Sequence, residues 1–85
     1  MPEISRFLGI VIKMYFDDHH PPHFHVLYGE YEAAFSIDTI EVIKGKLPPR
    51  VSGLVVEWAE LRRDDLKKNW ELLKEMKFNK IKPLV

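Results

Sequence analysis

The sequence contains no cysteine, which excludes disulfide bonds and metal sites built from thiolates. No apolar run approaches the ~20 residues that a membrane-spanning helix needs. The first residues, Met1-Pro2-Glu3-Ile4-Ser5-Arg6, lack the basic and apolar regions of a signal peptide. The formal net charge is zero, which argues against strong non-specific binding to nucleic acid. We therefore expect a cytoplasmic protein without a membrane segment.

Several catalytic motifs are also absent. The sequence has no glycine-rich phosphate loop, no His-Glu-x-x-His zinc motif and no Gly-x-Ser-x-Gly nucleophile elbow. With 85 residues the chain forms one domain with a small core. These absences leave acid–base chemistry by histidine, a metal site made from histidines and carboxylates, or binding without catalysis.

Charge is unevenly distributed along the chain. Residues 1–44 carry seven acidic and three basic residues, whereas residues 45–85 carry six acidic and ten basic residues. Such asymmetry can steer a partner or a second copy of the chain. A solvated helix surface rich in lysine is the simpler explanation.

The first half of the chain predicts a small antiparallel sheet. Residues 7–16 alternate apolar side chains on one side and predict a single strand. Residues 23–28 and 31–37 predict a hairpin, because Gly29-Glu30 fits a two-residue type II′ turn. Residues 40–44 predict a short fourth strand. The expected fold is α+β, with a sheet of three or four strands followed by helix.

The Gly29-Glu30 turn determines which residues of this hairpin face each other. The expected pairs on the core face are Tyr28 with Tyr31, Val26 with Ala33 and Phe24 with Phe35; those on the other face are Leu27 with Glu32, His25 with Ala34 and His23 with Ser36. Two histidines therefore share the face opposite the core with small side chains. If the fourth strand pairs tightly, Glu41 lies beside Ser36.

The second half of the chain has helical periodicity. Apolar residues recur at roughly 3.6-residue spacing between residues 49 and 77 and predict one long helix or a kinked pair packed on the aromatic face. One of the prolines before this segment is expected to open the helix, and Asp64 could cap a second one. Trp58 and Trp70 are predicted core anchors, with base stacking as the alternative.

The single domain, residues 1–85, thus divides into a sheet half at residues 1–44, a helical half at residues 45–78 and a tail at residues 79–85. Ile81 and Leu84 of the tail are available to dock on the rest of the domain.

All four histidines lie within residues 17–25, Asp-Asp-His-His-Pro-Pro-His-Phe-His. His23 and His25 are two residues apart on a predicted strand, so their side chains point the same way and their Cα atoms lie roughly 7 Å apart. Three interpretations remain open. In the first, the histidines are structural or bind a partner, for example by capping the turn or by hydrogen bonding to Asp17.

The other two interpretations are chemical. With Arg6 or a lysine to stabilise an oxyanion, His23 and His25 could cleave RNA without a metal. Alternatively, the two imidazoles could share a zinc ion, which needs three or four ligands. His19 is then the predicted third ligand, and His20 or Asp18 could complete the set.

A family resemblance supports the same residues. The segments that carry it are Pro2-Glu3-Ile4-Ser5-Arg6-Phe7, Gly9-Ile10, Asp18-His19-x-Pro21-Pro22-His23-Phe24-His25, Tyr28-Gly29-Glu30 and Glu57-Trp58-Ala59-Glu60-Leu61. Over nearly its whole length the chain resembles a bacterial family of small proteins known as a domain of unknown function. The matching motif positions are Arg6, His19, Pro21, Pro22, His23 and His25, whereas His20 occupies a variable position.

The resemblance implies a component of a two-gene module, suspected to be of the toxin–antitoxin type, encoded beside a small cognate protein. We therefore predict RNA cleavage or RNA-related binding through Arg6, His23 and His25, without a cofactor. A non-catalytic protein-interaction module and a zinc-dependent small hydrolase are the alternatives. A homodimer would cover apolar residues on the open sheet face, namely Val11, Tyr15 and Leu27.

Overall fold

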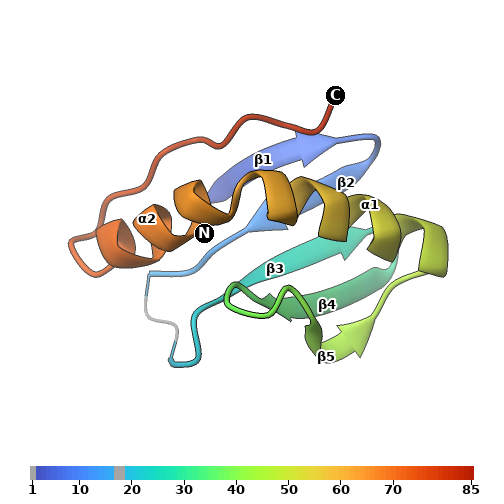
Figure 1. Ribbon diagram of the computed structural model, residues 1–85, viewed down its shortest axis with the longest axis horizontal. Coiled ribbons are helices and arrows are strands. Elements are labelled where there is room, and N and C mark those ends of the chain that lie inside the picture. Colours follow the sequence, from blue (N-terminus) through green and yellow to red (C-terminus); the bar gives the residue numbers. More distant parts are fainter. Residues whose placement is uncertain (1, 17–18) are drawn as a thin grey trace.

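The computed structural model describes residues 2–16 and 19–85. It has an α+β fold in which a five-stranded antiparallel sheet is followed by two helices. The strands lie in chain order, β1 to β5, so each strand pairs with the next one along the chain. Both helices lie across one face of the sheet (Figure 1). The predicted fold class is confirmed, with one strand more than the largest number expected.

Strands β1 (Glu3–Phe7) and β2 (Ile10–Lys13) form a hairpin where the sequence predicted a single strand from residue 7 to residue 16. The chain reverses at Leu8 and Gly9, whose φ angles are 51° and 79°. Positive φ at both central residues is the geometry of a type I′ turn. Gly9 adopts it freely, but leucine is uncommon there. The single-strand prediction was wrong because Leu8 fits the apolar alternation of residues 7–16, so the pattern gave no sign of a turn at this position.

Strands β3 (His23–Tyr28) and β4 (Tyr31–Ser36) form the predicted hairpin. Their register reproduces all six expected pairs, and Gly29 has the positive φ, 57°, that the turn requires. On the core face the rings of Phe24 and Phe35 stack with centroids 5.5 Å apart. Because this register is correct, the two histidines of β3 lie on the face opposite the core.

Strand β5 (Val42–Lys46) begins and ends two residues later than predicted, so the sheet extends past the predicted sheet half at residue 44. A register shift against β4 places Lys44, not an earlier residue, opposite Ala34. The carbonyl of Glu41 accepts a hydrogen bond of 2.9 Å from the backbone N–H of Ser36, so these two residues are neighbours as expected.

The helical half contains two helices, α1 (Pro49–Leu61) and α2 (Arg63–Leu73). The predicted pair is therefore correct, and Pro49 opens α1. The chain leaves helical geometry at Arg62, with φ −114° and ψ 19°, and Asp64 lies in the first turn of α2 without capping it. Trp58 is fully buried and contacts core rings of the sheet, which confirms it as a core anchor.

The C-terminal tail docks across the domain and ties it to the first strand. Ile81 is buried, and its N–H donates a 2.7 Å hydrogen bond to the carbonyl of Ile4. The indole Nε1 of Trp58 donates to the carbonyl of Lys82, at 2.9 Å. Asn69 exchanges two hydrogen bonds with the backbone of Asn79. Within the described residues, neither helix is long and apolar enough to cross a membrane.

Candidate functional site

The face of the sheet that the helices leave uncovered carries two rows of side chains, each with one residue per strand. Directly opposed residues of antiparallel strands project to the same side. The first row is Glu3, Lys13, His25, Ala34 and Lys44, and the second is Arg6, Val11, Leu27, Glu32 and Lys46. Four of these residues are basic and two are acidic. These two rows therefore carry a net positive charge although the whole chain is neutral.

A cluster of aromatic and imidazole rings lies at the start of β3. The rings of His23 and His25 contact each other with centroids 5.0 Å apart. Tyr15, from the segment after β2, lies edge-on to His25 at 4.4 Å. Trp70 of α2 lies 5.5 Å from His23 and 5.8 Å from His20. These five rings form a continuous cluster, which we call the ring cluster, from the open face to α2.

One hydrogen bond determines the tautomer of His23. Its Nδ1 lies 2.7 Å from the carbonyl oxygen of Pro21. A carbonyl oxygen can only accept, so Nδ1 carries a proton and donates it to this bond. In the neutral imidazole the lone pair is then on Nε2, the atom that could take a proton from a substrate. The loop before β3 therefore holds the Nδ1 side of the His23 ring in place.

Trp70 supports the ring cluster from the side of the core. Its side chain is 6% exposed, which confirms it as a core anchor and leaves little surface on which a base could stack. It also lines a hollow of about 50 Å³ together with Tyr15 and His20. Its buried Nε1 has no hydrogen-bond partner in the part of the chain that the structure describes. Trp70 was not predicted to contact the histidines.

Arg6 lies on the same open face as the histidines but at a distance from them. It is on β1, two strands from β3, which corresponds to roughly 10 Å across the sheet. Its guanidinium donates two hydrogen bonds, of 2.7 and 3.0 Å, to the carboxylate of Glu3. The hydrogen bond from Arg6 lowers the pKa of Glu3, and the same bond raises the pKa of Arg6. Arg6 is thus bound to a carboxylate rather than to the ring cluster.

The predicted metal ligands are only partly brought together. His23 and His25 are in contact, whereas His19 is exposed in the preceding loop. Among residues 2–16 and 19–85, no group of three or more histidine, aspartate or glutamate side chains is placed to hold a metal ion. Asp17 and Asp18, considered above as a histidine partner and a metal ligand, lie outside the described residues. The zinc site stays a prediction.

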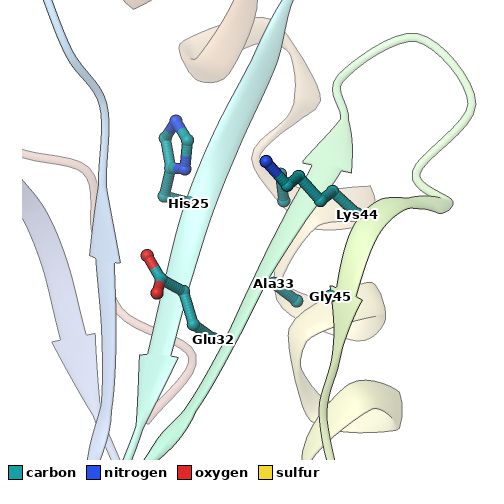
Figure 2. Close-up of a pocket in the computed structure, with 6 residues that line it drawn as sticks. His25, Glu32, Ala33, Lys44 and Gly45 are labelled. Carbon is teal, nitrogen blue, oxygen red and sulfur yellow. The ribbon is translucent and has the colours of Figure 1, made fainter.

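An open hollow of about 230 Å³ lies beside His25, over β3, β4 and β5. Figure 2 shows the side chains of His25, Glu32 and Lys44 around it. Ala34 lies between His25 and Lys44 in the first row, and its short side chain leaves the space open. We call this space the Ala34 hollow. It combines a carboxylate, an ammonium and an imidazole above an apolar floor.

The sequence did not identify Glu32 and Lys44 as site residues. The signal for Glu32 was available, because the predicted hairpin register already placed it on the histidine face. Lys44 gave no such signal, since the register shift between β4 and β5 determines its position opposite Ala34. The extra residue of this shift is Ile43, between Val42 and Lys44, and a β-branched residue of this kind gives no sequence signal for a bulge.

Comparison with known proteins gives one match. A family model described as "Domain of unknown function (DUF4160)" matches residues 9–71, more than half of the chain. The matched segment begins before β2 and ends in α2, so it contains all four histidines and the whole Ala34 hollow. Neither the curated proteins nor the solved structures give a match.

Proposed function

The chain belongs to the DUF4160 family, and we propose that it binds single-stranded RNA on the open face of its sheet, as one component of a cytoplasmic toxin–antitoxin-like pair. The observation that carries this proposal is the contact between the rings of His23 and His25, 5.0 Å apart, on a face with excess positive charge. Single-stranded RNA is held by rings that stack on bases and by basic groups that neutralise phosphates. The open face offers both.

Lysine residues are placed to hold the RNA backbone near the rings. Lys13 is directly opposite His25 on the neighbouring strand, and Lys44 is two strands away on the other side. These spacings correspond to roughly 5 and 10 Å between backbones. A phosphate that contacts His25 would therefore lie within reach of either lysine. Lys46 extends the same positive surface toward the β5 edge of the sheet, whereas the charge of Arg6 is paired with Glu3.

His23 and His25 would also allow cleavage without a metal. Neutral His23 takes the proton of a 2′-hydroxyl at Nε2, the 2′-oxygen attacks phosphorus, and protonated His25 gives its proton to the departing 5′-oxygen. The bond between phosphorus and the 5′-oxygen breaks, and a 2′,3′-cyclic phosphate forms. Lys13 is nearer than Arg6 to stabilise charge on the phosphoryl oxygens.

The catalytic part is tested by cleavage of a fluorescent single-stranded RNA. We expect His23→Ala and His25→Ala each to slow cleavage by about 10²- to 10⁴-fold. His19→Ala is the matched control, because this exposed imidazole lies outside the ring cluster. If the double variant cleaves RNA and inhibits growth as the wild type does, the catalytic role of the histidines is wrong.

The binding part is tested separately by affinity at several salt concentrations. Lys13→Gln combined with Lys44→Gln removes two charges from the open face. We expect weaker binding and a shallower salt dependence, by about 1.4 in the slope of log K against log salt. Lys67→Gln combined with Lys68→Gln removes the same charge from the exposed surface of α2 and should change neither. Equal effects of the two double variants would contradict an RNA site on the open face.

A second candidate function is binding of a cognate protein at strand β5. All five residues of β5 are exposed, and Val42 and Ile43 keep 44% and 49% of their surface. Among the described residues, no strand pairs with the outer side of β5. An exposed edge strand with apolar side chains is a template for an added strand. Protection of β5 amides from hydrogen exchange by the partner would support it, and protection of the open face alone would oppose it.

A further inference from the structure

The Ala34 hollow differs from the rest of the open face in its charge chemistry. Of the two acidic residues in the two rows of the open face, Glu3 pairs with Arg6. Within the residues that the structure describes, Glu32 makes no ion pair and no side-chain hydrogen bond, and its carboxylate lies at the hollow. The hollow therefore holds an acceptor group that the protein itself does not use.

We propose that the Ala34 hollow is a subsite that binds one unpaired guanine base of the RNA. The inference rests on the proposed RNA binding and goes beyond it by naming the base. A carboxylate has two acceptor oxygens and no donor. On its Watson–Crick edge guanine presents two adjacent donors, N1–H and the 2-amino group. Glu32 can accept both at once.

The other three bases do not satisfy this carboxylate. Adenine and cytosine each place an acceptor next to their amino group, and uracil flanks its single N–H with two carbonyl oxygens. Each would bring an acceptor against Glu32, and an acceptor facing a carboxylate is repelled and loses its water. Sequence-specific recognition of RNA reads such edges on unstacked bases. The carboxylate of Glu32 therefore favours guanine, which offers it two donors, and disfavours the other three bases, which place an acceptor against it.

Two other residues complete the subsite. Lys44 lies across the hollow from Glu32, and its ammonium can donate to guanine O6 or N7, a common contact of lysine with this base. Ala34 forms a flat apolar floor on which the base can lie. The volume of about 230 Å³ is below the range of sites for drug-sized ligands, which fits a single base. His25 borders the hollow, so a guanine bound there would place its own phosphate near the two histidines.

The test compares four RNA oligonucleotides that differ only in one central base, guanine, adenine, cytosine or uracil, in an otherwise uridine sequence. We expect the guanine oligonucleotide to bind wild-type protein about tenfold tighter than the others. In Glu32→Gln this preference should disappear, because an amide has only one acceptor oxygen. Loss of a negative charge should leave affinity for the other three unchanged or slightly higher. A purely electrostatic role of Glu32 would raise all four affinities together.

Two further variants separate the subsite from the general surface. Ala34→Leu fills the hollow without a change of charge, and we expect it to remove the guanine preference while a folded spectrum is retained. Glu30→Gln makes the same charge change as Glu32→Gln in the exposed turn between β3 and β4, outside the hollow, and should keep the preference.

A titration with guanosine monophosphate, followed by NMR, tests the subsite independently of RNA binding. We expect shifts at Glu32, Ala34 and Lys44, and weaker ones with adenosine monophosphate. RNA bound with equal affinity for all four bases would overturn the guanine subsite but not the proposed function. Guanosine monophosphate shifts at these residues without RNA binding would support the subsite and overturn the proposed function. No response to either would overturn both.

Discussion

Gly45 of β5 lies so close to the backbone of β4 that no side chain fits there. A Cβ built on Gly45 would collide with the carbonyl oxygen of Glu32. Gly45 also has φ of 77°, a conformation that other residues adopt only with strain. Gly45 lies opposite Ala33, and its neighbour Lys44 lies opposite Ala34 at the hollow. The two backbones therefore approach each other closely at Gly45, which lines the candidate guanine subsite.

Gly45→Ala should destabilise the protein and loosen β5, because the new methyl group forces the two strands apart. We expect a loss of about 1–3 kcal/mol in the free energy of unfolding, measured by urea denaturation. Gly53→Ala is the matched control, since Gly53 lies in α1 with nothing within 4 Å of the new Cβ. It should stabilise the protein by about 0.5–1 kcal/mol. The same sign for both variants would contradict this account of Gly45.

Asn69→Ala should release the C-terminal tail. Asn69 is buried, and its amide exchanges two hydrogen bonds with the backbone of Asn79. Removal of one side of this pair leaves polar groups unsatisfied and should cost about 1–3 kcal/mol. We also expect faster hydrogen exchange at the amide of Ile81, which is bonded to Ile4. Lys68→Ala, at an exposed neighbouring position, should leave that amide protected; equal exchange in both variants would rule out Asn69 as the anchor.

The pair of Glu3 and Arg6 should make the titration of Glu3 depend on Arg6. Arg6 lowers the folded-state pKa of Glu3, chiefly through their hydrogen bond. The resulting stability is complete above the unfolded-state pKa and is lost as pH falls through the folded-state value. In Arg6→Gln the pKa of Glu3, followed by NMR of its carboxyl group, should rise toward the usual value of 4.5. An unchanged titration would show that the pair does not persist in solution.

Removal of divalent metal should leave RNA binding and cleavage intact, because two imidazoles can supply both proton transfers. The measurement is cleavage of labelled RNA before and after dialysis against EDTA, with a zinc titration of wild type and His23→Ala/His25→Ala protein. Tight, stoichiometric zinc binding that the double variant loses, together with inactivation by EDTA, would favour the predicted site at His19, His23 and His25 instead.

The hairpin of β3 and β4 could be predicted residue by residue because two signals agreed. A two-residue turn with glycine first fixed the loop, and period-two alternation fixed the faces, which together placed His23 and His25 side by side. The hairpin of β1 and β2 could not be predicted, because its turn needs a positive φ at Leu8, and leucine seldom adopts one. Leucine has no local preference for this conformation, so its sequence position did not indicate the turn.

In the candidate site, too, the features set by local sequence could be predicted and those set by long-range packing could not. Residues on the predicted hairpin were assigned to the correct face, Glu32 included. The position of Lys44 depends on a bulge, and the contact of Trp70 with His23 depends on how α2 crosses the end of the sheet. Both are long-range features, so they have no counterpart in the spacing of residues along the chain.

The two edge strands of the sheet, β1 and β5, differ in how far the rest of the chain covers them. At β1 the carbonyls of Glu3 and Ile4 already accept hydrogen bonds from Lys80 and Ile81 of the tail, whereas β5 has no such cover among the described residues. Of the two edges, β5 is the more open to an added strand. Joining two copies through β5 would leave a capped strand at each end, so assembly would stop at two and could not propagate into a fibre. In such a dimer the tail would cap part of each outer edge.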